Sequence, residues 1–164
     1  MAQHDGTLVR PAERRDIPGI TKLAEATGLF PADVLLDLIS GYLTRQKDDV
    51  WIVHEEKSVV GRPILTGFGF CEIERAADGV WNLMALAVDP SHQRRGIGSK
   101  MVKFIESELT KQETRLILVE TASADEFERT SGFLKKVGFV EEARIREYYE
   151  KGVDKVVFRR HLRS

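Results

Sequence analysis

A strand, a basic glycine-containing turn and a helix in direct succession constrain the fold of this chain more than any other feature. Residues 81–88, Trp-Asn-Leu-Met-Ala-Leu-Ala-Val, form an apolar run of strand length. The turn that follows, residues 89–96, has the sequence Asp-Pro-Ser-His-Gln-Arg-Arg-Gly. After the turn, apolar residues recur at every fourth position, which predicts one face of an amphipathic helix: Ile97, Met101, Ile105 and Leu109.

The predicted helix N-terminus has the properties of a phosphate receptor. The first amides of a helix have no partner within it and lie at the positive end of its dipole. Gly96 and Gly98 carry no Cβ, so the backbone can approach an anion closely. Arg94, Arg95 and Lys100 add positive charge suited to a diphosphate.

Two common phosphate-binding motifs do not fit this turn. A P-loop requires G-x-x-x-x-G-K-[ST], which the segment Gly98-Ser99-Lys100 does not complete. A dinucleotide fingerprint requires a third glycine where Met101 stands. A third pattern, Q/R-x-x-G-x-G/A, is met by residues 93–98, Gln-Arg-Arg-Gly-Ile-Gly. An ordinary glycine turn before a surface helix is the alternative interpretation.

Residues 93–98, placed after a strand and before an amphipathic helix, resemble the coenzyme A pyrophosphate loop of the GNAT N-acetyltransferase family. Residues 133–139, Phe-Leu-Lys-Lys-Val-Gly-Phe, are similar to the F-Y-E-K-x-G-F block of that family. The resemblance covers nearly the whole chain and implies the GNAT fold, of mixed α/β class. That fold has a central, mostly antiparallel twisted sheet with a V-shaped splay between strands 4 and 5.

Local patterns along the chain predict the same element order, βααβββαβαββ. Strands are expected over residues 7–10, 50–54, 64–73, 81–88, 115–120, 139–149 and 153–162. Helices are expected to begin at Asp16 as N-cap, near Pro31 or Asp33, and at Ile97, and a fourth to cover 127–137. Residues 55–58 read as a turn, and the apolar run 116–119 suits a strand buried on both faces. Gly67 and Gly69 suggest a bulge or a close backbone approach.

The resemblance implies acetyl transfer from acetyl-CoA to an amine acceptor by direct attack in a ternary complex. The acceptor classes left open are a small molecule, an amino acid, and a protein N-terminus or lysine. The pantetheine arm of the co-substrate is then expected to pair with the end of the central strand, and an N–H near Leu86 to polarise the thioester carbonyl. The diphosphate is expected on the amides that begin the helix. The expected cofactor-binding residues are Leu86, Ala87, Val88, Arg94, Arg95, Gly96, Ile97, Gly98 and Ser99.

Acetyl transfer also requires the removal of a proton. A lysine-like amine has a pKa of about 10.4, so freeing its lone pair near pH 7 costs roughly 4 to 5 kcal/mol. A leaving thiol with a pKa near about 8.5 is disfavoured by only about 2 kcal/mol, so a general base is worth more than a general acid. Glu120 is the candidate base, because some family members place a catalytic glutamate at the end of the fifth strand. Asn82 is a second candidate, which can orient a water but cannot take a proton. A solvated strand-end carboxylate and a hydrogen-bonded polar residue are the alternative interpretations of these two positions.

The chain departs from the family pattern at the expected acid. Many members have a tyrosine in the block where this sequence has Leu134. Tyr148 or Tyr149 can approach from the sixth strand, although packing or acceptor-site lining explains them as well. The departure leaves open a non-catalytic module that binds or senses acyl-CoA. A nucleotide-binding protein that uses the same glycine turn is a third hypothesis.

Composition limits the remaining function classes. The chain has 164 residues, enough for one domain, residues 1–164, with a substantial core. Its formal net charge of -1 gives no field that would favour nucleic acid or a membrane. One cysteine excludes a disulfide framework, and the scattered histidines predict no metal site. Residues 1–6 lack a leader pattern, so a cytoplasmic location is expected. By analogy with family members that dimerise, the resemblance implies a homodimer as one expected assembly.

Overall fold

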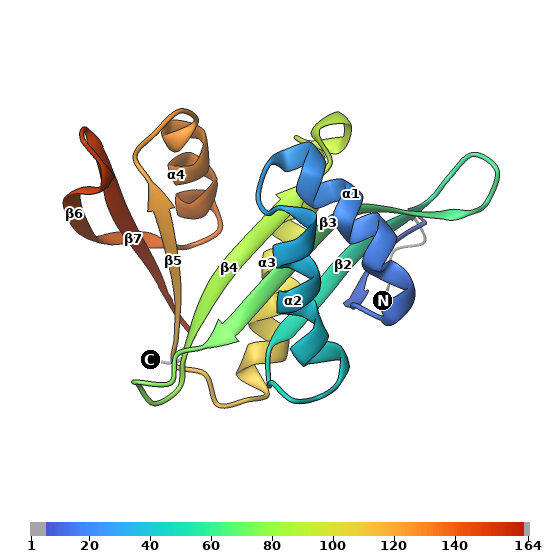
Figure 1. Ribbon diagram of the computed structural model, residues 1–164, viewed down its shortest axis with the longest axis horizontal. Coiled ribbons are helices and arrows are strands. Elements are labelled where there is room, and N and C mark those ends of the chain that lie inside the picture. Colours follow the sequence, from blue (N-terminus) through green and yellow to red (C-terminus); the bar gives the residue numbers. More distant parts are fainter. Residues whose placement is uncertain (1–5, 163–164) are drawn as a thin grey trace. The chain divides into compact units, whose positions relative to one another are not determined.

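A computed structural model describes residues 6–162, and over this range the chain forms one mixed sheet and four α-helices (Figure 1). The strands are β1 (Thr7–Pro11), β2 (Val50–Lys57), β3 (Pro63–Ile73), β4 (Val80–Val88), β5 (Leu116–Ala122), β6 (Val140–Glu150) and β7 (Val153–His161). The helices are α1 (Ile17–Thr27), α2 (Ala32–Leu43), α3 (Ile97–Thr110) and α4 (Phe127–Lys136), with short 3-10 turns at Arg14–Asp16 and Pro90–His92. The predicted order βααβββαβαββ is confirmed. Residues 1–5, which contain most of the segment examined for a leader, lie outside the described range.

The seven strands follow the order β1-β2-β3-β4-β5-β7-β6. The pairs β1–β2, β2–β3, β5–β7 and β6–β7 are antiparallel. β4 and β5 run parallel, and their ladder joins Val80–Asn82 to Leu116–Leu118. Within residues 6–162 this ladder contains no later pair, which confirms the predicted splay between strands 4 and 5.

The backbone divides into two compact units. The first unit contains the described residues up to Glu72 together with Ala85–Ser107. The second unit contains Ile73–Met84 together with the described residues from Glu108 onward. Whether the chain acts as one domain stays a prediction, and each unit is described by itself below.

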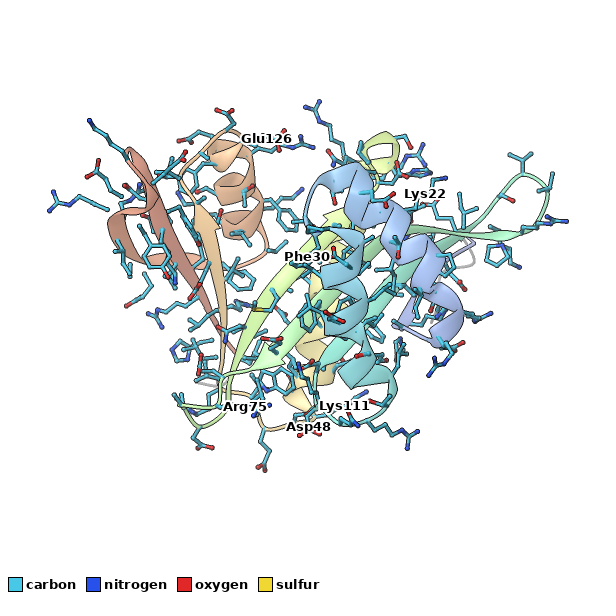
Figure 2. All side chains as sticks on the ribbon, in the orientation of Figure 1. Lys22, Phe30, Asp48, Arg75, Lys111 and Glu126 are labelled. Carbon is cyan, nitrogen blue, oxygen red and sulfur yellow. The ribbon has the colours of Figure 1, made fainter. Side chains whose placement is uncertain are left out.

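In the first unit, α1 and α2 pack on one face of the sheet (Figure 1). The ring of Trp51 stacks on that of Phe70 with centroids 4.1 Å apart, and Ile20 and Ile39 of the two helices belong to the same buried cluster. Phe30, in the connection between α1 and α2, covers the edge of this cluster (Figure 2). The hydrophobic faces of the two helices are therefore held by burial rather than by capping side chains.

Helix α3 packs on the opposite face of the same strands, and two glycines make this approach close. A Cβ at Gly67 would lie 2.8 Å from the Met101 sulfur, and one at Gly69 would lie 3.3 Å from Ile105 Cδ1. The predicted close backbone approach at these glycines is confirmed. The helix stripe is confirmed as well, because its four apolar residues are all buried: Ile97, Met101, Ile105 and Leu109.

In the second unit, α4 covers one face of strands β5 and β7. The centroid of the Phe127 ring lies 6.4 Å from that of the Phe158 ring. Phe158 is fully buried, and Leu134 and Phe139 are no more than 3% exposed. Every residue of β6 is exposed. Glu126 lies just before α4 (Figure 2). Its backbone is left-handed, with φ of 68°.

Three local expectations about strands differ from the structure. β2 continues to Lys57, so residues 55–58 are largely strand rather than turn, because β1 pairs with Glu55 and Glu56. β5 continues past Glu120 to Ala122, because β7 pairs with its last residues. Within the predicted doubly buried run 116–119, only Ile117 is buried and the other three residues are half-buried.

Asp16 occupies the N-cap position of α1, but it does not cap the helix. Its carboxylate accepts hydrogen bonds from both terminal nitrogens of Arg10, each at 2.8 Å, and from the backbone N–H of Glu13 at 2.7 Å. The carboxylate thus binds both terminal nitrogens of a largely buried guanidinium, and this contact competes with capping for the same oxygens. The predicted position is correct and the predicted role is wrong.

Candidate functional site

The turn before α3 is built by side chains that hold its first residues in place. Asp89 Oδ1 accepts hydrogen bonds from Ser91 N at 2.8 Å and Ser91 Oγ at 2.6 Å. These bonds keep the pKa of Asp89 below its usual value, with the Ser91 hydroxyl as the largest cause. Gln93 Nε2 donates to the carbonyl of Val88 at 3.3 Å, which ties the turn to the end of β4. The segment therefore has a defined geometry before any ligand arrives.

The backbone then winds through two left-handed residues into the helix. Arg94 has φ of 66° and Gly96 has φ of 75°, and the first of these conformations is uncommon for a residue with a side chain. The first helical bond runs from Lys100 N to Gly96 O at 3.1 Å. Among the described residues, no protein group accepts a hydrogen bond from the backbone N–H of residues 94–99. A row of unpaired donors at a helix N-terminus is an anion-binding arrangement.

The side chains of this row differ in exposure in a way that supports the role of the amides. Ile97 is 3% exposed, so its side chain anchors the helix start in the core, while its backbone N–H has no acceptor among the described residues. Arg94 and Arg95 are exposed, whereas Gly98 and Ser99 are half-buried. Sequence alone indicated Ile97 as a ligand-binding residue through its backbone, and the structure gives its side chain a separate structural task.

The end of β4, where the pantetheine arm is expected, alternates between buried and accessible side chains. Ala87 is 2% exposed, and Leu86 and Val88 are half-buried. The N–H of Asp89, directly after the strand, donates to the carbonyl of Thr66 on β3 at 2.8 Å. These three predicted residues and the row 94–99 all lie in the first unit.

A pocket of about 270 Å³ lies beside the start of α3, and the sequence analysis did not find it. It is lined by residues that come from three separate parts of the first unit: Thr7, His54, Glu56, Arg95, Ile97 and Lys100. His54 is fully buried and its Nδ1 lies 2.6 Å from the Thr66 hydroxyl. Because β1 and β2 bring residues far from the turn to its side, no local pattern could reveal this pocket.

Glu120, the candidate base, lies in the second unit and is engaged by a lysine. Its Oε2 is 2.8 Å from Nζ of Lys155, and its side chain is 48% exposed. The hydrogen bond from Lys155 to this carboxylate is the main reason why the pKa of Lys155 is raised. The side chain of Lys155 is only 14% exposed, and its Nζ lies 4.5 Å from the centroid of the Tyr148 ring. Nothing in the sequence indicated Lys155 as a functional residue.

Asn82, the second candidate, is hydrogen-bonded within the second unit. Its Nδ2 donates to Oε2 of Glu74 at 3.2 Å. A backbone bond from Ala76 and then this bond from Asn82 lower the pKa of Glu74. In the parallel ladder Asn82 pairs with Leu118, two residues before Glu120, so both candidates have positions on the same face of the sheet.

Leu134, which stands at the usual tyrosine position, is 3% exposed. Its side chain therefore points from α4 into the core, and leucine has no proton to donate. Tyr148 and Tyr149 are 53% and 48% exposed, and their rings meet edge to face with centroids 4.9 Å apart.

Comparison with known proteins settles the family. The model of the Acetyltransferase (GNAT) domain matches residues 46–141, more than half of the chain. The chain belongs to the GNAT acetyltransferase family. The matched segment contains the turn before α3, Asn82 and Glu120, and it ends before Tyr148 and Lys155. A search of functionally curated proteins finds no match.

Solved structures share the fold of this GNAT chain. A proposed GNAT acetyltransferase from Desulfovibrio desulfuricans aligns with a TM-score of 0.83 at 23% identity, over 96% of this chain and 99% of that one. A proposed acetyltransferase from Salmonella typhimurium, solved with its cofactor acetyl-CoA, gives 0.78 at 16% identity, over 98% and 96%. The ribosomal-protein-S18-alanine N-acetyltransferase of Escherichia coli gives 0.73 at 16% identity, over 96% and 95%.

The described part of this GNAT chain has three further features of chemical interest. Across residues 6–162, His, Cys, Asp and Glu side chains form no group of three or more that could hold a metal ion. None of the helices in that range combines the length and the apolar character needed to cross a membrane. Cys71 is fully buried, and burial raises the pKa of its thiol, so the thiol stays protonated near neutral pH.

Proposed function

We propose that this protein transfers the acetyl group of acetyl-CoA to an amine by direct attack in a ternary complex. The single observation that carries the proposal is the row of unpaired amides over residues 94–99 at the start of α3. Such donors match the oxygens of a diphosphate, and family membership makes the diphosphate of coenzyme A the expected ligand. Arg94 and Arg95, exposed on the same turn, add charge for those oxygens.

The chemistry then needs a polarised carbonyl and an unprotonated amine. The end of β4, Leu86 to Val88, is proposed to pair with the pantetheine arm, with the amide near Leu86 donating to the thioester oxygen. The amine nitrogen attacks the carbonyl carbon, the C–N bond forms, and the C–S bond breaks to release the thiolate of coenzyme A. The ammonium loses one proton before attack, and the nitrogen loses a second proton after it, which neutralises the thiolate.

Glu120 is proposed as the base that takes the first of these protons. Its half-exposed carboxylate already contacts an ammonium, that of Lys155, at 2.8 Å. We propose Asn82 as a residue that orients a water through its Oδ1, because its Nδ2 is engaged with Glu74. No tyrosine stands at position 134, and a thiolate is a tolerable leaving group without one.

A non-catalytic module that binds acyl-CoA is the second candidate, and the burial of Leu134 favours it. The two functions differ in one observable. An enzyme releases free coenzyme A thiol when acetyl-CoA is mixed with a panel of amines, whereas a sensor binds acetyl-CoA and releases none. Tight binding of acetyl-CoA with no thiol release for any amine would favour the sensor.

The amide row itself is tested by a proline that removes one donor. Gly98 occupies the second position of α3, where its N–H has no acceptor within the helix, and we expect proline to be tolerated there as it is at Pro18 in α1. Gly98→Pro should weaken the binding of coenzyme A by about 10- to 100-fold, the loss of one hydrogen bond to a charged group. Gly98→Ala keeps the N–H and is the matched control. Calorimetry showing equal affinity in both variants would contradict the proposal, as would a preference for NAD or ATP.

A further inference from the structure

Two side chains of the second unit contact the ammonium of Lys155, and a third packs against one of them. Its Nζ lies 2.8 Å from Glu120 Oε2 and 4.5 Å from the centroid of the Tyr148 ring. Tyr149 meets the Tyr148 ring edge to face. A carboxylate and an aromatic face are the two groups that proteins use to bind ammonium ions. The cluster therefore has the composition of an ammonium receptor, and the receptor is occupied by a residue of the chain itself.

Strand register explains how Lys155 reaches this position. β5 and β7 are antiparallel, with Ala122 opposite Lys155 and Glu120 opposite Val157. Glu120 and Lys155 are therefore diagonal neighbours on one face of the sheet. The face opposite to theirs carries the buried residues Val156 and Phe158. The side chain of Lys155 is 14% exposed, whereas that of Glu120 is 48% exposed. Solvent can therefore reach the cluster from the side of the Glu120 carboxylate.

An irregularity in β6 supplies the two rings. The ladder with β7 passes from Ile145 opposite Lys155 to Glu150 opposite Val153, so residues 146–149 bulge out of register. Glu147 in this bulge has φ of 52°. A bulge of this kind redirects side chains, and here it places two consecutive tyrosines in contact with each other.

Asp154 holds the bulge from the neighbouring strand. Its Oδ1 accepts from the N–H of Glu147 at 3.0 Å, and its Oδ2 accepts from Arg144 at 2.9 Å. Its own N–H donates to the Ser123 hydroxyl at 2.7 Å. The N–H of Glu147 is the largest cause of the lowered pKa of Asp154. An ion pair that serves stability alone requires neither a fixed bulge nor two adjacent rings.

We infer that Glu120, Tyr148 and Tyr149 bind the ammonium group of a primary alkylamine acceptor, and that Lys155 occupies this site while the acceptor is absent. The inference rests on the proposed acetyl transfer and names its acceptor class. The occupant is an unbranched butylammonium, so the site fits an amine on an unbranched alkyl chain. The α-amine of a peptide is branched at the carbon next to nitrogen and fits less well. Half-exposed ion pairs and cation–π contacts are weak, so an incoming amine can exchange with Lys155.

The first experiment removes the competitor. Lys155→Met keeps the apolar stem and deletes the charge, and it should lower the KM for n-butylamine about three- to tenfold, the worth of a weak ion pair and one cation–π contact. Lys151→Met, in the exposed turn between β6 and β7, is the matched control and should leave that KM unchanged. A KM for n-butylamine that rises or stays the same in Lys155→Met overturns the inference.

A second pair of variants tests the aromatic face. Tyr148→Leu removes the aromatic face and should raise the KM for n-butylamine about threefold or more, whereas Tyr148→Phe keeps the ring and should raise it less. The KM for acetyl-CoA should not change in either variant. Equal KM values for n-butylamine in both would show that the ring does not bind the ammonium.

A third measurement does not depend on turnover. In protein with ¹⁵Nζ-labelled lysine, the Lys155 signal, assigned by its loss in Lys155→Arg, should move toward that of an exposed lysine as n-butylamine is added. The amide of alanine, with a branched α-amine, should move it less at equal concentration. Displacement of Lys155 by n-butylamine without thiol release from acetyl-CoA would contradict the proposed function and support the ammonium site. Thiol release with n-butylamine while the Lys155 signal stays in place would contradict the ammonium site and support the proposed function.

Discussion

Two ion pairs of the same chemical type, one in each unit, show how surroundings decide what a pair does. In the first unit, Arg10 and Asp16 are 13% and 5% exposed and meet through two hydrogen bonds of 2.8 Å, with Glu55 as a second partner at 3.1 Å. In the second unit, Lys155 meets the 48% exposed Glu120 through one contact. The carboxylate of the first pair is buried, whereas the carboxylate of the second pair is half-exposed and open to a competing ammonium.

The pKa shifts follow the same division. Burial by itself would raise the pKa of Asp16, but hydrogen bonds from Arg10 and from the Glu13 N–H outweigh burial and lower it below its usual value. The hydrogen bond to Asp16 is the largest cause of the strongly raised pKa of Arg10. A largely buried pair with two hydrogen bonds fixes structure, while a half-exposed pair with one contact can exchange its partner.

The largest expected effect comes from breaking each pair in turn. Asp16→Ala leaves the buried guanidinium of Arg10 without its main partner and should lower the free energy of unfolding by about 3–5 kcal/mol. Glu120→Ala removes a half-exposed partner and should lower it by no more than about 1 kcal/mol. Urea denaturation of both variants at neutral pH measures the difference. Similar losses in the two would show that the pairs are not distinct in kind.

Packing gives a second, smaller contrast between the units. A Cβ at Gly67 would lie 2.8 Å from the Met101 sulfur and 3.0 Å from the Ala87 carbonyl, so Gly67→Ala should lower the free energy of unfolding by about 1–3 kcal/mol. A Cβ at Gly132 in α4 would meet nothing within 4 Å, so Gly132→Ala should raise it by about 0.5–1 kcal/mol. Thermal unfolding of the two variants gives the signs, and a loss in both would contradict the contrast.

The smallest expected effect is a change in how steeply the free energy of unfolding falls with pH in acid. The pKa of Asp16 is lower in the folded chain than its ordinary value of 3.8, so its ion pair stabilises the fold above that pH. This contribution is lost as the pH falls below 3.8 and through the folded pKa. Asp16→Asn should therefore be less stable at neutral pH and show a flatter loss of stability in that acid window. A variant curve that runs parallel to wild type would show that Asp16 carries none of the acid sensitivity.

The predictions that held depended on neighbouring residues. The helix stripe from Ile97 to Leu109 and the glycine turn before it are local patterns, and both appear in the structure as predicted. The end of β2 was missed because Glu55 and Glu56 look like turn residues in isolation. In the fold they pair with β1, where Arg10 lies 3.1 Å from Glu55 and supplies the counter-charge.

The candidate site divides in the same way. Residues 94–99 follow from one short motif, because a helix start with glycines leaves amides unpaired wherever it occurs. The contacts of Lys155 could not be predicted from the sequence. They depend on the strand register that places it diagonal to Glu120 and on the bulge in β6 that brings the Tyr148 ring to it. The pocket beside α3 was missed for the same reason.

By itself, the sequence determined the element order, the helix face and the anion-binding turn, because each of these depends on the spacing of residues within about one helix or strand length. Only the tertiary structure decided which charges meet, which carboxylate is closed off and which stays open, because strand pairing joins residues such as Arg10 with Glu55 and Glu120 with Lys155 that lie far apart in the chain. Local spacing carries no record of such long-range register.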